Sequence, residues 1–278
     1  MKKIVYICDY FIKHVLGGAE INDDVLINEI LKPTFDTRQV QSNVVNLEFL
    51  REEVDSLFII GNFINLSKNC KEYLQNNCKY IIYEHDHKYL ISRNPVLFEN
   101  YKAPPEEIIN IDFYANALRI IAQSNFHKKI IEKNLNIKNV FSIGGNLWPE
   151  SILKEIKLMN KNTKISSIAI LNSSILHKNT AEAVRYCEAK DLNYTLIKDR
   201  NYKEFLKKLN SCSTFLFLPK TPETLSRVVV EARMLGLKTI TSKNIGALYE
   251  PWFKLKGDDL VEVMEKKKKK AYKLINEQ

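Results

Sequence analysis

The sequence predicts an α/β protein made of two doubly wound domains. Short apolar runs alternate with amphipathic segments along the whole chain, a pattern typical of parallel sheets covered by helices. The length of 278 residues is enough for two compact domains. All eight glycines fall at predicted loops or element ends, where backbone freedom is needed. We place the boundary near Trp148-Pro149, so that residues 1–148 form the first domain and residues 149–278 the second.

The first domain is expected to contain six strands and several helices. Apolar runs predict strands at Lys3–Cys8, Val40–Val45, Ser56–Ile60, Lys79–Tyr83, Leu118–Ala122 and Val140–Ile143. Helical periodicity predicts helices over Ile21–Leu31 and Leu66–Asn76, and a third from about Asn125. A longer irregular region, Lys88–Asn116, contains three prolines and interrupts the alternation.

The alternation begins again after a lysine-rich connector that reads as helical up to about Asn162. Strands are expected at Ile165–Leu171, Tyr194–Ile197, Thr214–Leu218 and Leu237–Thr241. Helices are expected at Thr180–Ala189, Tyr202–Leu209 and Leu225–Leu235, the last capped by Gly236. The basic C-terminal segment predicts a final helix, which we assign to this second domain.

The composition excludes several classes of protein. The chain is 45% hydrophobic and 27% charged, unlike a disordered or collagenous sequence. Its five cysteines are odd in number and form no close Cys-x-x-Cys pair, which argues against a disulfide scaffold and a structural zinc site. No stretch approaches the ~18–20 apolar residues that span a bilayer. We therefore expect a soluble, cytoplasmic protein.

The positive charge is concentrated in the second half of the chain. Through Trp148 there are 17 Lys and Arg against 18 Asp and Glu, whereas the remainder holds 25 against 15. A net charge of +10 predicts an anionic partner, either nucleic acid, an acidic membrane surface or a phosphorylated small molecule. The run Lys266–Lys270 supplies part of this charge, and it could equally be the solvated face of a final helix.

The segment Leu218–Ser242 carries the most chemical information. It reads as a strand, a loop with two prolines, a helix, a glycine and another strand. We expect Thr224 to cap the helix and the backbone amides of Leu225 and Ser226 to point outward, which would form an anion site. Glu223 precedes the helix and Glu231 lies within it, where a carboxylate can accept hydrogen bonds from a ribose diol.

This segment resembles the Glu-x7-Glu motif of the retaining family-4 glycosyltransferases. The resemblance lies in the context of the two glutamates: a strand ending in Leu-Pro, then Pro-Glu-Thr-Leu-Ser, Val-Val-Val-Glu-Ala and Leu-Gly-Leu. Other pieces match in order, so the resemblance covers nearly the whole chain. It implies the GT-B fold, two Rossmann-like domains facing across a cleft, and transfer of a sugar with retention. It also implies a UDP- or GDP-linked nucleotide-sugar donor and no metal or other cofactor.

The same resemblance implies roles for individual residues. Gly17 and Gly18 match a glycine loop that approaches the donor diphosphate and the acceptor, although alone they read as a tight turn before a helix. His85 matches a histidine that contacts the donor sugar, and it could equally be an ordinary loop histidine. Lys178 matches a lysine that binds the donor phosphates. The backbone amides of Thr224, Leu225 and Ser226 would bind the diphosphate, Glu231 the ribose and Glu223 the sugar.

The sequence departs from the family pattern at one position. Asn172-Ser173 stands where a glycine-arginine pair is expected, so one phosphate-binding cation is missing or comes from elsewhere, with Arg227 and Lys220 as candidates. This departure puts activity itself in doubt. Base recognition would rest on the short stretch Lys198–Arg200. In Glu84–His87, two histidines could share a strand face and bind zinc, but no third ligand is evident.

The acceptor is not determined by the sequence. A glycan, a lipid-linked acceptor and a modified nucleic acid stay open, although no aromatic-basic motif supports nucleic acid, and the lysine run permits peripheral contact with an anionic membrane. Candidate acceptor contacts lie in Lys88–Asn116 and near Lys13–Leu16. Within the former, Tyr89, Arg93, Tyr101 and Tyr114 offer polar and stacking surfaces, although packing within the loop is favoured. Two other functions remain: an inactive nucleotide-binding or regulatory protein, and a nucleotide-sugar epimerase.

Overall fold

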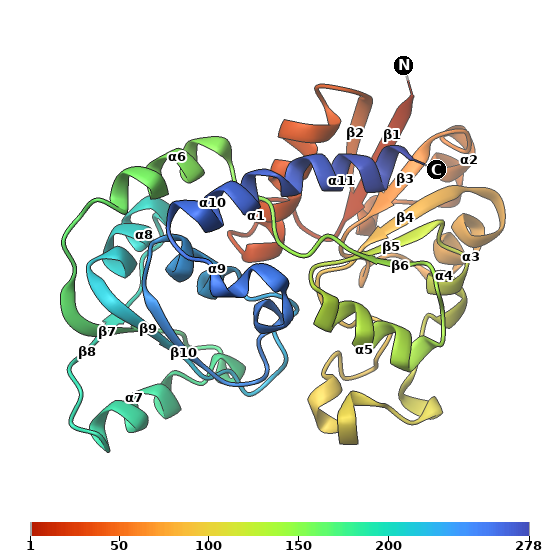
Figure 1. The fold of residues 1–278 in the computed structure, drawn as a ribbon. Coiled ribbons are helices and arrows are strands. Elements are labelled where there is room, and N and C mark those ends of the chain that lie inside the picture. The colour runs from red at the N-terminus through yellow and green to blue at the C-terminus, as the bar shows by residue number, and fades with distance from the viewer. Residues whose placement is uncertain (1, 278) are drawn as a thin grey trace. The chain divides into compact units, whose positions relative to one another are not determined.

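The chain forms two compact α/β units in a computed structural model that describes residues 2–277 (Figure 1). The first unit comprises the chain up to Leu147 together with the residues from Lys267 onward. The second unit comprises Trp148–Lys266. The predicted domain boundary therefore lies one residue from the end of the first unit's main segment.

The first unit contains a six-stranded sheet in the order β2-β1-β3-β4-β5-β6, and all its pairings are parallel. The strands are β1 (Lys3–Cys8), β2 (Asp36–Gln41), β3 (Leu57–Ile60), β4 (Lys79–Tyr83), β5 (Arg119–Ala122) and β6 (Val140–Ser142). Both faces of the sheet are buried. In β1, Ile4 and Tyr6 join one apolar cluster while Val5 and Ile7 join the other, as the period of two requires.

The helices of this unit begin where the sequence offers a cap. They are α1 (Gly18–Val25), continued by the π-helical turn η1 (Leu26–Leu31), then α2 (Leu47–Glu52), α3 (Lys68–Asn77), α4 (Ile111–Ala115) and α5 (Asn125–Leu135). The side chains of Asn46, Ser67 and Ser124 each accept a hydrogen bond from the amide three residues on, which satisfies one free donor of the first turn. The expected irregular region consists of short 3-10 turns and α4.

The second unit contains a four-stranded sheet in the order β10-β9-β7-β8, again with parallel pairings. The strands are β7 (Ile165–Leu171), β8 (Tyr194–Ile197), β9 (Cys212–Phe217) and β10 (Lys238–Thr241). The helices are α6 (Glu150–Met159), α7 (Thr180–Glu188), α8 (Tyr202–Asn210), α9 (Arg227–Met234) and α10 (Asp258–Glu265), with 3-10 turns η6 (Leu176–Lys178), η7 (Gly246–Tyr249) and η8 (Pro251–Lys254).

One predicted strand is misplaced. The apolar pair in Val40–Val45 suggested a strand there, but β2 ends at Gln41 and residues 42–44 form a 3-10 turn. Because β2 is the edge strand and pairs only with β1, its residues are mostly exposed or half-buried. An edge strand of this kind lacks the continuous apolar run that marks the buried strands.

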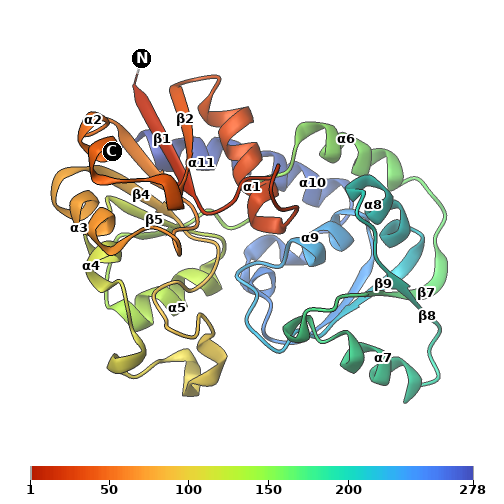
Figure 2. The ribbon, with the colours of Figure 1, turned by 180° about the vertical axis from the view of Figure 1, so that it is seen from behind.

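The terminal helix α11 (Lys267–Asn276) belongs to the first unit, and its predicted assignment to the second domain is wrong. Figures 1 and 2 both show it alongside the six-stranded sheet. Ala271 and Ile275 are buried in an apolar cluster of this unit, and the Arg119 guanidinium donates to the carbonyl oxygen of Leu274 at 2.7 Å. Helix α11 belongs to the first unit because it packs against that unit's sheet. The local sequence does not encode this packing.

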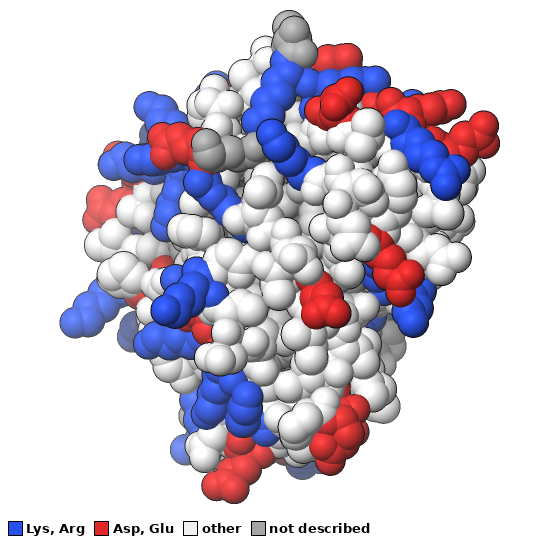
Figure 3. All heavy atoms as spheres, turned by 90° about the vertical axis from the view of Figure 1, so that its right-hand side faces the viewer, with Lys and Arg blue, Asp and Glu red and all other residues white. Residues whose placement is uncertain are grey.

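This assignment changes the charge balance. The five lysines of α11 move to the first unit, which leaves the second unit with a net charge of +6 rather than +10. Lys268 forms an ion pair with Glu29 of η1, so the lysine run is partly used within the unit. The face in Figure 3 shows Lys and Arg interspersed with Asp and Glu around an uncharged centre. Among residues 2–277, each helix is too short or too polar to cross a bilayer.

Replacing Ile275 tests the role of α11. Ile275 is 1% exposed, so Ile275→Ala should lower the free energy of unfolding by about 2–4 kcal/mol. Urea denaturation followed by far-UV circular dichroism measures the loss. Lys273→Ala, on an exposed face of the same helix, is the control and should change stability by less than about 0.5 kcal/mol. Equal behaviour of the two variants would contradict the packing of α11.

Candidate functional site

Each unit has one point where the order of its strands reverses. In the first sheet β1 lies between β2 and β3, and in the second sheet β7 lies between β8 and β9. Ligands of open α/β sheets bind beyond the carboxyl ends of the strands at such a point. The loops after β1 and β3, and those after β7 and β9, are therefore the places to look for functional side chains.

In the second unit, Lys178 and Glu223 meet at this point. Lys178 follows β7 and Glu223 follows β9, and the Lys178 Nζ lies 2.7 Å from the Glu223 Oε1. Their side chains are 25% and 16% exposed, so both remain accessible. The structure thus brings together the two residues that were assigned to the donor phosphate and the donor sugar.

Backbone contacts hold these two loops against each other. Asn179 adopts a left-handed conformation, with φ of 59°, and its side-chain amide donates to the carbonyl oxygen of Leu218 at 2.9 Å. The amide of Lys220 donates to the carbonyl oxygen of His177 at 2.9 Å. Asparagine tolerates this conformation better than most residues, so the loop geometry is encoded locally.

Helix α9 begins later than predicted, at Arg227, and Thr224 is not its cap. The residues ahead of the helix pair with another segment: Glu223 forms a bridge with Ile245, and the carbonyl oxygen of Leu225 accepts from the amide of Ala247. This pairing with the segment after β10 competes with the helix and delays its start. Leu225 is only 1% exposed. Its backbone amide therefore does not lie on an open surface, contrary to the prediction.

Ser226 occupies the cap position in an unusual conformation. Its φ is 74° and its ψ is 86°, a region that costs a residue other than glycine about 1–3 kcal/mol. The side chain makes no capping hydrogen bond. Ser226 is 5% exposed, and its hydroxyl has no hydrogen-bond partner among residues 2–277. A buried donor without a partner at the start of a helix is a feature that a bound anion would satisfy.

Glu231 lies inside a buried cluster. Its Oε1 accepts hydrogen bonds from the Trp148 indole at 3.0 Å and from the Tyr202 hydroxyl, and it pairs with the Arg227 Nε at 3.0 Å. Burial raises the pKa of Glu231, although Arg227 and the other donors oppose this. All three donors converge on one oxygen, and no donor among the described residues reaches Oε2.

Arg227 is committed to this cluster. Its guanidinium lies 4.4 Å above the Trp148 ring and 5.8 Å from the Tyr202 ring centroid, and its side chain is 10% exposed. Arg227, one candidate for the missing phosphate-binding cation, is therefore already paired. The other candidate, Lys220, is exposed, and its amide binds the loop that carries Lys178. The amide of Ser173 donates to the Thr180 hydroxyl, and the Ser173 hydroxyl accepts from the amide of Ile175.

In the first unit, Gly17 and Gly18 open α1 as expected, with Gly17 at the cap position. A Cβ built on Gly17 would lie 2.3 Å from the Glu20 Oε2, so the missing side chain leaves room for this carboxylate. Glu20 therefore folds back over the start of its own helix, where a negative charge is favourable. Burial raises the pKa of Glu20.

His85, after β4, pairs with Asp23 of α1. The His85 Nε2 lies 2.5 Å from the Asp23 Oδ1, and both side chains are nearly buried. The imidazole also packs edge-on against Tyr83, with 5.0 Å between ring centroids. Burial by itself would lower the pKa of His85, but the charge of Asp23 and its hydrogen bond outweigh burial and raise the pKa. Asp23 thus favours the imidazolium form.

The remaining polar residues after β4 pair with neighbouring side chains. The Lys88 ammonium is buried and pairs with Glu84, and it lies 2.9 Å from Asp86. His87 contacts the Tyr89 hydroxyl at 2.9 Å, so its ring and that of His85 have different partners. Burial lowers the pKa of His87 to about 4.

The tyrosines suggested for acceptor contact in this region pack within the loop. Tyr89 and Tyr114 are fully buried, and Tyr114 donates to Glu84. Tyr101 packs edge-on against Phe126. The favoured interpretation, that these side chains hold the loop down, is confirmed for Tyr89 and Tyr114, whereas Arg93 pairs with Asp86 but its side chain is 48% exposed.

Sequence reasoning missed Asp23, Trp148 and Tyr202 as partners of the candidate residues. Arg227 was expected as a phosphate-binding cation and not as the partner of Glu231, although their i, i+4 spacing on a predicted helix was a signal that could have indicated the pair. No local pattern connects Trp148 or Tyr202 to Glu231, because 83 and 29 residues separate them along the chain. Asp23 and His85 are likewise 62 residues apart.

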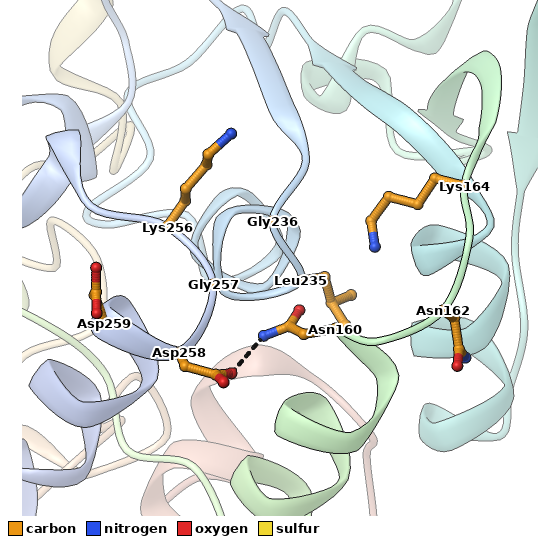
Figure 4. A pocket seen from close by; sticks show the side chains of 9 residues that line it. All are labelled: Asn160, Asn162, Lys164, Leu235, Gly236, Lys256, Gly257, Asp258 and Asp259. Carbon is orange, nitrogen blue, oxygen red and sulfur yellow. Dashed lines mark hydrogen bonds between the residues drawn. The ribbon is translucent and has the colours of Figure 1, made fainter.

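The second unit also contains an open cavity of about 530 Å³ that is separate from these residues (Figure 4). It is lined by Leu235 and Gly236 after α9 and by residues at the start of α10, where the Asn160 amide donates to the Asp258 carboxylate at 2.8 Å. Helix α9 lies between this cavity and Ser226, and its 8 residues span roughly 12 Å at a rise of about 1.5 Å per residue. We therefore assign the cavity no part in the candidate site.

Replacing Ser226 tests the strain at the start of α9. Ser226→Gly should raise the free energy of unfolding by about 1 kcal/mol, because glycine accepts the positive φ and removes the unpaired hydroxyl. Ser226→Ala is the matched control, since it removes the hydroxyl but keeps the strained backbone, and its gain should be smaller. Chemical denaturation measures both, and a destabilised glycine variant would show that the hydroxyl has a partner in solution.

The His85–Asp23 pair should make stability depend on pH. Because the pair raises the pKa of His85 above its ordinary value of 6.5, its contribution is complete below pH 6.5 and is lost as the pH rises through the folded-state pKa. Asp23→Asn should flatten this part of the profile. Unfolding free energies measured from pH 5.5 to 9 for both proteins provide the comparison, and parallel profiles would contradict the pairing.

The sequence matches no protein-family model and no curated protein, but solved structures resemble its fold. HepE from Anabaena, in a complex with UDP and glucose, has a TM-score of 0.55 at 12% identity, over 97% of this chain and 89% of that chain. The trehalose-6-phosphate synthase OtsA has a TM-score of 0.56 at 9% identity, over 99% and 96%. A UDP-forming trehalose-phosphate synthase from Burkholderia xenovorans has a TM-score of 0.54 at 8% identity, over 99% and 94%.

At these identities the likeness establishes the fold alone. Parallel sheets of six and four strands, each covered by helices, match the arrangement in these glycosyltransferase structures. The predicted fold class, α/β with two Rossmann-like units of the GT-B type, is confirmed.

Proposed function

We propose that the protein is a glycosyltransferase that uses a nucleoside-diphosphate sugar as donor. The observation that carries this proposal is the meeting of Lys178 and Glu223 at the strand-order reversal of the second sheet, beside the unpaired Ser226 hydroxyl. A cation, a carboxylate and a helix start at such a point suit a phosphorylated, hydroxyl-rich ligand. The likeness to a solved structure in a complex with UDP and glucose supports a UDP-linked donor, and a GDP-linked one is the alternative.

The Lys178–Glu223 ion pair would be exchanged when the donor binds. A diphosphate is a stronger partner for an ammonium than one carboxylate, because it carries more charge and more acceptor oxygens. Lys178 would turn to the diphosphate, and the released Glu223 would accept hydrogen bonds from the sugar. The amides of Thr224, Leu225 and Ser226 would add donors for the charge that develops on the leaving phosphate. Leu225 and Ser226 are buried, so their part of the segment would open when the donor binds, whereas Thr224 is half-buried.

Glu231 would hold the ribose through the oxygen that its partners leave available. Trp148, Tyr202 and Arg227 hold Oε1, so the carboxylate is oriented before the ligand arrives. Oε2 is then the acceptor for a ribose hydroxyl. Preorganisation of this kind reduces the entropy lost on binding.

In the first unit, His85 is proposed to contact the donor sugar, with Asp23 holding its ring in place. Gly17 and Gly18 are proposed to let the chain approach the donor or acceptor closely, with Glu20 moving aside. The acceptor, a glycan or lipid-linked molecule, would attack the anomeric carbon through a hydroxyl oxygen, from the same face that the diphosphate leaves. The new glycosidic bond forms as the bond to the diphosphate breaks, and the proton passes to the leaving phosphate. This course retains configuration and needs no metal ion.

The location that we propose is the cytoplasm, with peripheral contact to an anionic membrane as an option. Lys269 and Lys270 are exposed on α11, and each lysine near an anionic surface contributes about 1 kcal/mol. Lys267 and Lys268 are partly buried, which leaves a smaller basic surface than the sequence suggested.

A second function, nucleotide binding without catalysis, is favoured by one observation. No arginine stands at Asn172-Ser173, and Arg227 is held by Glu231. With fewer cations on the diphosphate, the leaving group is stabilised less. Nucleotide binding without turnover of any nucleotide sugar would identify this function.

Substituting the two glutamates separates binding from turnover. A thermal-shift screen against UDP, GDP, ADP and CMP should show stabilisation by one diphosphate, about 2.7 kcal/mol at 100 times its dissociation constant. Glu231→Gln should weaken that binding about tenfold, since one hydrogen bond to the ribose is changed. Glu223→Gln should reduce donor hydrolysis or transfer more than binding.

The control for both variants is Glu182→Gln, an exposed glutamate of α7 that should behave as wild type. Binding by titration calorimetry is measured at a temperature at which every variant is folded, because Glu231→Gln disturbs a buried ion pair. If wild type binds none of the nucleotides, or if both site variants bind and react as wild type does, the proposed site is wrong.

A further inference from the structure

A second cavity lies in the first unit and has no part in the proposed donor site. It has a volume of about 240 Å³ and lies among the loop after β1, the outer face of α1 and η1, and the edge strand β2. At ~30 Å³ for each water, this space corresponds to about eight waters. It is therefore large enough for one monosaccharide unit but not for an extended chain.

One side of the cavity is a row of polar side chains on a single helix face. Glu20, Asp24, Asn28 and Lys32 follow one another at intervals of four residues, the spacing that aligns side chains along a helix. The Asn28 side-chain amide group donates to the Asp24 carboxylate at 2.7 Å, and the Lys32 ammonium donates to the side-chain oxygen of Asn28 at 2.9 Å. These bonds hold the row in a defined orientation beside the cavity.

The formal charges around the cavity cancel. Glu20 and Asp24 are opposed by Lys13 and Lys32, and Gln39 on β2 adds a neutral amide. A cavity without excess charge does not select a phosphate, a carboxylate or a cation. It offers closely spaced hydrogen-bond donors and acceptors instead, which is the requirement of a hydroxyl-rich molecule.

The cavity also has an apolar part. Phe11, which is 7% exposed, and the half-buried Ile12 belong to its lining. Glu20 and Asp24 are half-buried, whereas Asn28, Lys32 and Gln39 are exposed at the rim. The combination of apolar contact with planar amide and carboxylate groups suits a sugar ring, which presents both C–H surfaces and hydroxyls.

Glu20 links this cavity to the candidate sugar contact. It lines the cavity, and its carboxyl group interacts electrostatically with both Asp23 and His85. Glu20 is therefore the lining residue that interacts with both the cavity and the His85–Asp23 pair. The cavity also adjoins β1, the strand at the order reversal of this sheet.

We propose that this cavity binds a neutral sugar unit of the acceptor, through hydrogen bonds to Asp24, Asn28 and Gln39. This inference rests on the proposed glycosyltransferase function and narrows its acceptor to a molecule that carries an uncharged sugar. Lys13 and Lys32 complete the charge balance and do not bind a phosphate. Glu20 borders the cavity as one of its lining residues.

Sugar binding can be tested without turnover by ligand-observed NMR. Methyl glycosides of glucose, galactose and mannose are the probes, with glucose 6-phosphate as a charged comparison. Saturation transfer from wild-type protein to at least one methyl glycoside is expected, with a weaker signal for glucose 6-phosphate. Asp24→Ala and Gln39→Trp, which fills the cavity from its exposed rim, should each weaken glycoside binding at least fivefold.

Matched controls use the same substitutions outside the cavity. Asp55→Ala removes an exposed carboxylate elsewhere in the unit, and Asp36→Trp adds an indole on the opposite face of β2, since side chains alternate along a strand. Both should bind glycosides as wild type does. UDP stabilisation measured by thermal shift should be the same in all five proteins, which also shows that they are folded.

The outcomes separate this inference from the proposed function. Absence of glycoside binding by wild type, binding that persists in Gln39→Trp, or stronger binding of glucose 6-phosphate would overturn the sugar site. Glycoside binding that is lost in both cavity variants supports it. A wild-type protein that binds glycosides but no nucleotide would support the cavity as a sugar site and contradict the glycosyltransferase proposal.

Discussion

A buried carboxylate needs donors, because the cost of removing its charge from water is otherwise several kcal/mol. This constraint organises the region around each candidate site. Glu231 is held by Trp148, Tyr202 and Arg227, which come from three separate parts of the second unit. Glu84 is held in the first unit by Lys88 and Tyr114. Each carboxylate therefore fixes the relative positions of the elements that supply its partners.

The candidate residues differ in how completely their polar groups are paired. Glu231 is buried, and three partners hold one of its carboxylate oxygens, which suits a residue that positions a ligand. Lys178 and Glu223 form an ion pair with each other and remain partly exposed, so a ligand with stronger charge can separate them. Ser226 is the opposite case, since its buried hydroxyl has no hydrogen-bond partner in the part of the chain that the structure describes and its backbone is strained. Strain of this kind is concentrated at functional sites.

The two proposed ligands meet different kinds of surface. The donor site combines an exchangeable ion pair with a helix start, and both favour an anion. The cavity beside α1 has balanced charges and a row of polar side chains held by Asn28, which favours a neutral polyol. This contrast matches the chemical difference between a nucleotide sugar and an uncharged acceptor sugar.

The α/β class, most of the strands and the position of Lys178, Glu223 and His85 in loops that follow strands can be predicted from the amino-acid sequence. These features are local, because an apolar run, a glycine stop or a residue after a strand can be recognised without its neighbours in space. The partners of these elements depend on packing in three dimensions: Asp23 for His85, Trp148 and Tyr202 for Glu231, and the six-stranded sheet for α11. The tertiary structure also moved the start of α9 from Thr224 to Arg227, because pairing with residues 244–247 competes with the helix. Contacts between residues far apart in the chain depend on how the elements pack, and no local pattern encodes them.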